Sequence, residues 1–405
     1  MQRLYKVAIG LIMAFSSIVS LQCVNHNKNT ARRYMAKGLP NKTSFKKHCL
    51  RDMGKNVRSL PVASKNQASA AQVIPEAGMP RQKPIAIVYN KNYDVGFWGL
   101  EKWHPFDGAK YSKVYAYLQS LVFGKFGMPR GRVTFHTPEK VTDQQLRLVH
   151  TQEYLKSLKS SAVVARITEV LPLRWLPNFL VQWKVLDPMR YATGGTILGA
   201  QLALENGLAI NLSGGYHHAK ANSGEGFCVF ADISIAMATL WQKNPTLKIM
   251  IIDLDAHQGN GHESIAKNDP RVTIFDIYNK DVYPNDKAAQ KYITFNYPVR
   301  SHINDAEYLE LLHDELPKAL KAAKPDLIIY NAGTDIYEDD PLGRMGVTAQ
   351  GIIERDSYVI THARACGIPT LMVLSGGYTK KSADIIGKSI ENIIKKNTAA
   401  NKCIR

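Results

Sequence analysis

From Pro84 onward the chain alternates short, strongly apolar runs with longer stretches whose apolar residues recur at helical spacing. Six runs rich in Ile, Val and Leu are candidate strands: 85–89, 208–212, 248–254, 272–277, 326–330 and 370–374. Seven stretches are candidate helices: 107–120, 143–156, 191–205, 233–242, 306–322, 349–365 and 382–395. The strands are too apolar to have one face in water, which is typical of a parallel sheet covered on both sides. The alternation predicts a doubly wound α/β fold of three layers with a central, mainly parallel sheet, and Asp305 suits the N-cap of the helix over 306–322.

The first 23 residues carry a separate signal. An apolar run over 7–21 follows a basic start, which is typical of a secretory signal peptide or a membrane anchor. Cys23 directly after the run would suit lipidation, although the residues before it are a poor match to a lipidation site. An organelle transit peptide is the alternative, because no acidic residue precedes Asp52. We expect export or membrane anchoring, with an organelle, or the cytoplasm and nucleus, as alternatives.

Charge separates the next segment from the folded part. The net charge is +18, and residues 1–83 carry +13 of it through 15 Lys or Arg and 2 acidic residues. Residues 24–83 are polar and basic without a sustained apolar period, so we expect a flexible linker. The folded domain is expected over 84–395 and a basic tail over 396–405. Because the folded part is nearly neutral, no specific nucleic-acid binding is expected, whereas the basic amino-terminal part suits contact with a membrane surface.

Polar, glycine-rich clusters follow four of the predicted strands. They occupy residues 213–218, 253–261, 331–335 and 375–378. In an open parallel sheet, ligands bind beyond the carboxyl ends of the strands, so the four clusters are expected on one rim. The five cysteines are scattered and show neither a disulfide framework nor a cysteine-based zinc pattern.

Three residues of these clusters have the chemistry of a metal site. Asp255 and His257 stand two apart at a strand end, where side chains at i and i+2 point the same way. Asp335 follows another strand and would complete a set of two carboxylates and one imidazole. Three protein ligands with an open position are typical of a catalytic zinc ion. A single Asp-x-His pair usually has no such role, and the prediction depends on the other clusters.

Two adjacent histidines, His217 and His218, are candidates for acid–base chemistry. Asp253 could accept a hydrogen bond from one imidazole and raise its pKa, while Asn260 could orient the other without adding charge. One histidine would then be a neutral base and the other a more cationic partner. Tyr378 after Gly376-Gly377 could donate to the developing oxyanion of an amide substrate. The alternative interpretation is that His217, His218 and Tyr378 are ordinary surface or partly buried side chains without a catalytic function.

Five motifs together resemble the histone deacetylase family, within the arginase–deacetylase fold. They are Gly-Gly-Tyr-His-His-Ala (214–219), Gly-Phe-Cys (226–228), Ile-Asp-Leu-Asp-Ala-His-Gln-Gly-Asn-Gly (252–261), Asn-Ala-Gly-Thr-Asp (331–335) and Ser-Gly-Gly-Tyr (375–378). The resemblance covers roughly residues 84–395. Residues 99–107 and 176–180 are similar to the class IV branch in particular.

The resemblance implies a role for each residue of the site. It places one catalytic Zn²⁺ on Asp255, His257 and Asp335. It makes His217 and His218 the acid–base pair, puts Asp253 behind His217, and makes Tyr378 the oxyanion-stabilising phenol. It further implies an acyl-lysine tunnel lined by Phe227 and Tyr283 with Gly226 at its mouth, and a structural K⁺ near Asp253, Asp255, His257 and Asp276.

Asn260 departs from many members of the family, which have Asp there. Class IV members resemble this chain in having Asn, and the missing charge is expected to lower the pKa of His218. The activity implied is zinc-dependent hydrolysis of the N6-acyl-lysine amide of a protein or peptide, with an acetyl or a long-chain acyl group. Deacetylation of acetylpolyamines or other small amides is one alternative, and a non-catalytic scaffold on the same fold is another.

Overall fold

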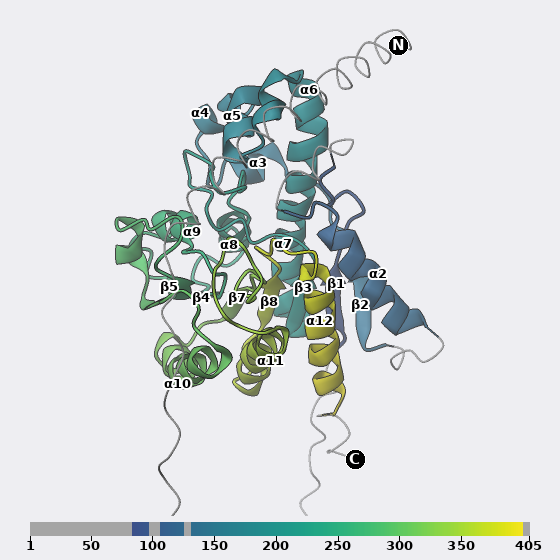
Figure 1. Ribbon diagram of the computed structural model, residues 1–405, viewed down its shortest axis with the longest axis vertical. Coiled ribbons are helices and arrows are strands. Elements are labelled where there is room, and N and C mark those ends of the chain that lie inside the picture. The colour runs from purple at the N-terminus through teal and green to yellow at the C-terminus, as the bar shows by residue number, and fades with distance from the viewer. Residues whose placement is uncertain (1–82, 97–105, 125–130, 400–405) are drawn as a thin grey trace, which may run out of the picture. The chain divides into compact units, whose positions relative to one another are not determined.

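The structure, a computed structural model, describes residues 83–96, 106–124 and 131–399, with side chains up to residue 396 (Figure 1). Contacts divide the chain into two units, and the second, Gly78–Arg405, contains every described residue. The predicted signal or anchor segment, nearly all of the predicted linker and most of the basic tail lie outside the described residues. Within the described residues, no helix is both long and apolar enough to cross a membrane.

The core of the domain is one sheet of eight parallel strands in the order β2-β1-β3-β8-β7-β4-β5-β6. The strands are β1 (Ile85–Val88), β2 (Val133–His136), β3 (Leu208–Asn211), β4 (Ile249–Asp253), β5 (Val272–Asn279), β6 (Phe295–Val299), β7 (Leu327–Asn331) and β8 (Thr370–Val373). All six predicted strands are present, and the prediction of a parallel α/β sheet is confirmed.

Helices cover both faces of the sheet (Figure 1). One apolar cluster joins the sheet to α2 (Lys110–Phe123), α10 (Asp305–Ala323), α11 (Ala349–Ala365) and α12 (Ser382–Ala399). A second joins the opposite face to α5 (Ser161–Ile167), α7 (Asp187–Asn206) and α8 (Asp232–Trp241). Alternate residues of each central strand enter the two clusters, Ile85 and Ile87 the first, Ala86 and Val88 the second. This arrangement explains why the central strands carry apolar residues on both faces.

Short helices surround this framework. They are α3 (Asp143–Leu146), α4 (Gln152–Ser157), the 3₁₀ helix η2 (Leu171–Trp175), α6 (Asn178–Val181), the π-helix η3 (Gln182–Leu186), α9 (Asn260–Ile265) and the 3₁₀ helix η4 (Ala289–Tyr292). Helices α3 to α6 gather at one end of the domain, at the top of Figure 1. Their segment leads through η3 directly into α7, and it forms part of the wall of the site described below.

Three details of the prediction are wrong or incomplete. The expected helix over 143–156 is two short helices, because the chain turns after α3 and Thr151 caps a new start by accepting from the backbone N–H of Tyr154. The N-cap of α10 is Asn304, whose Oδ1 accepts from the backbone N–H of Glu307 at 3.0 Å, while Asp305 accepts from Thr348 instead. The edge strands β2 and β6 were missed, because both are partly exposed and lack a continuous apolar run.

Candidate active site and metal centre

The four polar clusters meet because the strands before them are neighbours. β3, β8, β7 and β4 are consecutive in the middle of the sheet, so their carboxyl ends form one short stretch of the rim. Backbone hydrogen bonds join the loops directly, for example from Leu254 N–H to the carbonyl of Asn331 and from Ser375 N–H to that of Gly214. The loops therefore form one connected surface.

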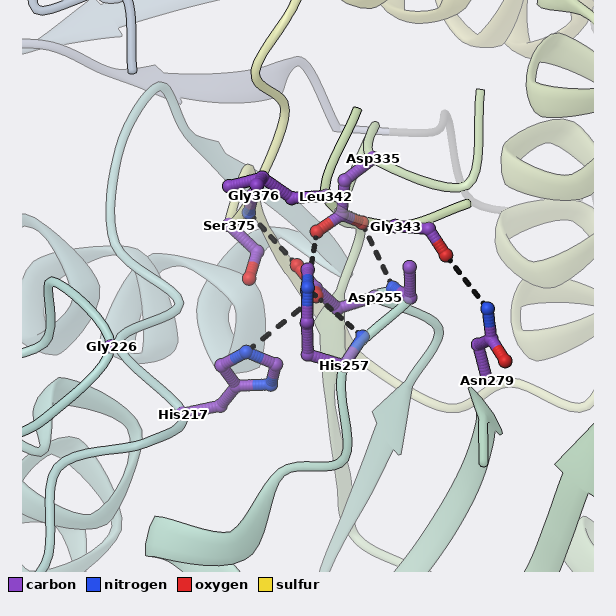
Figure 2. Close-up of polar contacts among 12 residues, drawn as sticks. His217, Gly226, Asp255, His257, Asn279, Asp335, Leu342, Gly343, Ser375 and Gly376 are labelled. Carbon is purple, nitrogen blue, oxygen red and sulfur yellow. Dashed lines mark hydrogen bonds and ion pairs between the residues drawn. The ribbon is translucent and has the colours of Figure 1, made fainter. Parts of the chain in front are cut away.

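The three predicted metal ligands are brought together at this rim (Figure 2). Nδ1 of His257 lies 3.1 Å from Oδ1 of Asp255 and 2.9 Å from Oδ2 of Asp335. All three side chains are buried, and one donor atom of each lies within 4.8 Å of the others. Figure 2 also shows His217 directed at Asp255, with Nε2 3.6 Å from Oδ1.

Backbone donors hold the two carboxylates in place. Asp255 Oδ2 accepts from Gly376 N–H at 2.9 Å, and Asp335 Oδ1 accepts from Ala256 N–H at 2.9 Å. A Cβ at Gly376 would lie 2.3 Å from Asp335 Oδ2, and one at Gly333 would lie 2.2 Å from Asp255 Oδ2. Glycine is therefore required at both positions for the backbone to approach the carboxylates this closely.

The electrostatics of the three residues fit a divalent cation. Burial and the neighbouring Asp255 raise the pKa of Asp335 to about 7. Burial favours neutral His257, but hydrogen bonds to Asp255 and Asp335 outweigh it and raise its pKa to about 10. In the absence of a cation, the raised pKa values mean that bound protons offset the negative charge of the two buried carboxylates. A bound divalent cation would offset that charge instead and displace the protons. Two oxygen donors and one imidazole nitrogen are a donor set that zinc accepts.

His217 and His218 lie side by side with their ring centroids 4.1 Å apart. His217 donates through Nδ1 to Oδ2 of Asp253 at 2.9 Å, and His218 donates through Nδ1 to Oδ1 of Asn260 at 2.8 Å. Burial disfavours the charged form of both rings. At His217 the carboxylates of Asp253 and Asp255 outweigh burial and raise the pKa to about 9. At His218 burial and the neighbouring His217 lower the pKa well below its ordinary value.

Asn260 belongs to a longer chain of hydrogen bonds that the sequence analysis missed. Its Nδ2 donates to Oε1 of Glu225 at 2.7 Å, and Lys220 bridges Glu225 at 3.1 Å and Asp286 at 3.0 Å. A carboxylate can only accept, so Glu225 fixes which side of the Asn260 amide is nitrogen and leaves the oxygen for His218. The Nε2 of His218 is then the unprotonated nitrogen, available to accept a proton.

Tyr378 and Phe227 line a cavity of about 100 Å³ beside the histidines. The Tyr378 ring lies 6.1 Å from that of His257 and 5.9 Å from that of Phe227, and burial raises the pKa of its phenol well above the ordinary value. The phenol is therefore a neutral donor. The cavity wall also includes the apolar side chains of Val170, Leu173 and Val185.

Gly226 and Tyr283 lie at the edge of this site. The ring of Tyr283 packs edge-on against His218 with the centroids 5.0 Å apart, but it is half exposed and does not line the cavity. A Cβ at Gly226 would lie 2.6 Å from Cδ2 of His218 and 3.1 Å from Cε1 of Tyr283. Gly226 therefore fills the narrow space between the two rings, where no side chain fits.

Two buried cations that the sequence analysis missed hold the loops together. The Nη1 of Arg355, in α11, donates to the carbonyls of Leu254 at 2.9 Å and Gly333 at 2.7 Å. Leu254 directly precedes the predicted metal ligand Asp255, and Gly333 stands two residues before Asp335. Lys110, in α2, donates to the carbonyl of Ser375 at 2.8 Å. Each was detectable as a charged residue at a helical spacing otherwise occupied by buried apolar side chains.

A second cluster of possible cation ligands lies behind His217. Donor atoms of Asp253, His262 and Asp276 lie within 4.8 Å of one another, and all three side chains are buried. Asp253 and Asp276 belong to the set expected to hold K⁺, whereas His262 was not singled out from the sequence. In this cluster His262 Nε2 lies 3.6 Å from Asp253 Oδ2.

Comparison with known proteins agrees with this geometry. Residues 104–395 match the model of the histone deacetylase domain. The chain is 47% identical over 309 residues to histone deacetylase 2 of Arabidopsis thaliana, covering 76% of this chain and 78% of the relative. It is 25% identical over 307 residues to human histone deacetylase 1, covering 72% and 61% of the two chains. The crystal structure of the HDA15 HD domain superposes with a TM-score of 0.61 at 22% identity, covering 78% of this chain and 89% of that chain, which shows the same fold. The chain belongs to the histone deacetylase domain family.

Proposed function

We propose that the protein is a zinc-dependent hydrolase of N6-acyl-lysine amides. The observation that carries the proposal is a buried group of three metal ligands next to two histidines held in different protonation states. A scaffold without activity would not need this asymmetry, which costs burial of several ionisable groups.

The side chains divide the chemistry among them. A zinc ion held by Asp255, His257 and Asp335 would supply Lewis acidity at the amide carbonyl. His218 Nε2 accepts a proton from the attacking water, because this histidine is neutral. His217, cationic through Asp253, provides the proton for the leaving lysine amine. The neutral phenol of Tyr378 donates to the oxygen that becomes negative.

The substrate is expected to enter past Gly226, Phe227 and Tyr283. The apolar side chains of Val170, Leu173 and Val185 line the same cavity as the two histidines and suit an acyl group longer than acetyl. Asn260 and the sequence over 176–180 support assignment to the class IV branch. K⁺ held through Asp253 and Asp276, together with Asp255 and His257, would stabilise the loop that carries two zinc ligands.

The test is turnover of matched acetyl-, octanoyl- and myristoyl-lysine peptides by the chain from Pro80 onward. Asp255→Ala and Tyr378→Phe should each abolish most turnover, chelation should do the same, and Tyr292→Phe on η4 is the matched control. Zinc content would be measured on every variant. A folded protein that binds zinc and turns over none of the peptides would refute the proposal.

An acetylpolyamine is the second candidate, because Glu225, Glu169 and Asp286 all contribute negative charge around Tyr283 at the cavity edge. Lys220 neutralises part of this charge by pairing with Glu225 and Asp286. Direct competition between acetylspermidine and an acetyl-lysine peptide separates the two substrates.

We also propose that residues 1–23 direct export or membrane anchoring, with an organelle, or the cytoplasm and nucleus, as alternatives. The support is the apolar run over 7–21 after a basic start. Fusions with and without residues 1–23, followed by fractionation and mass spectrometry of the mature amino terminus, distinguish these outcomes.

A further inference from the structure

Large exposed apolar side chains are concentrated in one short segment of the domain. Leu171, Trp175, Phe179 and Trp183 are 63%, 62%, 69% and 56% exposed. We call these four side chains the apolar face. Single exposed apolar residues are ordinary, but several in one segment mark a surface that meets another apolar phase.

The apolar face is not a by-product of folding. Its members recur every fourth residue through η2, α6 and η3, whereas Leu173, Val181 and Val185 of the same segment are buried in the core. Helices this short are not stable alone, so the buried residues hold the segment in place. Polar residues at the four exposed positions would preserve that packing, so the burial of Leu173, Val181 and Val185 does not require apolar side chains there.

Charge near the apolar face indicates what it meets. Residues 156–186 contain five Lys or Arg and one acidic residue, Glu169. The Cζ of Arg174 lies 5.5 Å from the ring centroid of Trp175, and Nζ of Lys184 lies 3.9 Å from that of Trp183. Indole rings with cations beside them are typical of protein surfaces at the headgroup level of anionic bilayers.

The segment also connects this surface to the site. Val170, Leu173 and Val185, which line the cavity, come from the same stretch of chain as the apolar face. We propose that Leu171, Trp175, Phe179 and Trp183 dock the domain on an anionic lipid bilayer, with the wall of the cavity directly behind the docking segment. This inference does not depend on the proposed reaction, and it concerns a different part of the chain from the amino-terminal apolar run.

The test uses the full chain and vesicles of phosphatidylcholine with and without phosphatidylserine. Because the amino terminus could attach the protein by itself, the decisive signal comes from Trp175 and Trp183. Brominated lipids should quench part of the emission of the parent, and that part should be missing in the variant Trp175→Phe/Trp183→Phe, whose phenylalanines preserve binding. Quenching should be stronger with phosphatidylserine present.

A second variant measures the contribution to binding. Trp175→Ser/Phe179→Ser/Trp183→Ser should lower partitioning onto phosphatidylserine vesicles by about tenfold or more. Phe123→Ser, at a residue 72% exposed outside the segment, is the matched control and should partition like the parent. Turnover of a soluble peptide by the triple variant checks that the domain remains folded.

Two results would overturn the proposal. In the first, the emission of Trp175 and Trp183 is not quenched on bound protein, or the triple variant partitions like the parent. In the second, the parent self-associates in sedimentation experiments and the triple variant does not, which would show that a second copy of the chain covers the apolar face.

Discussion

The two histidines of the site are adjacent in sequence, yet their surroundings differ. His217 donates to the carboxylate of Asp253, which is fully buried beneath the rim. His218 donates to the amide of Asn260, and the nearest carboxylate on that side, Glu225, lies one hydrogen bond further away and is partly exposed. One histidine therefore contacts a charge and the other contacts a dipole.

This difference shows how a pair of adjacent histidines can hold one proton on His217 and leave His218 neutral. Direct contact with a carboxylate stabilises the imidazolium of His217, whereas an amide adds no charge to oppose the burial of His218. The cation at His217 then lowers the pKa of its neighbour further. A bound dication would lower both pKa values by repulsion.

Replacing either histidine by alanine is expected to have the largest effect on activity. His218→Ala should lower kcat/KM for an acyl-lysine peptide by about 10³-fold, because the neutral base is lost. His217→Ala should cost about 10²-fold, because the proton source for the leaving lysine amine is lost while His218 remains as the base and Tyr378 as the donor to the oxyanion. Steady-state kinetics with zinc content measured on each variant check this order. Equal losses, or the reverse order, would show that the roles are not divided in this way.

Asp253→Asn tests the charged half of the pair. The substitution removes the charge that raises the pKa of His217, so His217 should lose its proton at lower pH. In the proposed mechanism activity requires the proton on His217, so kcat/KM falls as pH rises through the pKa of this residue. The alkaline limb of the pH profile should therefore move to lower pH than in the parent, with about a tenfold loss of kcat/KM at pH 8. The pH dependence of kcat/KM is the measurement, with Tm in K⁺ and Na⁺ as a control for folding. An unmoved alkaline limb would exclude His217 as the acid.

Asn260→Asp would give His218 a carboxylate partner, like the one that Asp253 gives His217. A carboxylate next to His218 should raise its pKa, so the ring should be protonated, and inactive as a base, at higher pH than in the parent. The acidic limb should move upward by about one unit or more, with a severalfold loss near pH 6 and little change near pH 8. The same pH series measures it. If the limb stays where it is, His218 does not set the acidic side of the profile.

The fold was predictable where the chain is buried on both sides. The six central strands carry apolar residues on both faces, so a run rich in Ile, Val and Leu identifies each of them. β2 and β6 at the two edges are partly exposed, and Pro298 interrupts the pattern of β6. β2 and β6 form strands because they pair with β1 and β5, and that pairing cannot be read from the sequence of the edge segments themselves.

The same distinction applies to the site. Asp255, His257, Asp335 and Tyr378 follow strands directly, so the strand ends place them. Arg355 lies in the middle of α11, about a hundred residues from the carbonyl of Leu254 that it contacts, and nothing in the local sequence names that partner. Glu225 likewise reaches Asn260 only through the packing of separate loops.

Glu225 offers the finest test of the comparison, because it acts on His218 only through Asn260. Glu225→Gln removes a negative charge one hydrogen bond away, so the pKa of His218 should fall slightly and the acidic limb should move to lower pH, opposite to its movement in Asn260→Asp. The loss in kcat should be about two- to fivefold, because a glutamine oxygen can still accept from Asn260. Glu225→Ala should cost more, since the amide of Asn260 is then free to turn its nitrogen toward His218. Glu310→Gln, exposed on α10, is the control. If kcat and the acidic limb of the alanine variant match the parent, the orientation of Asn260 is held without Glu225, and the amide alone accounts for the neutral histidine.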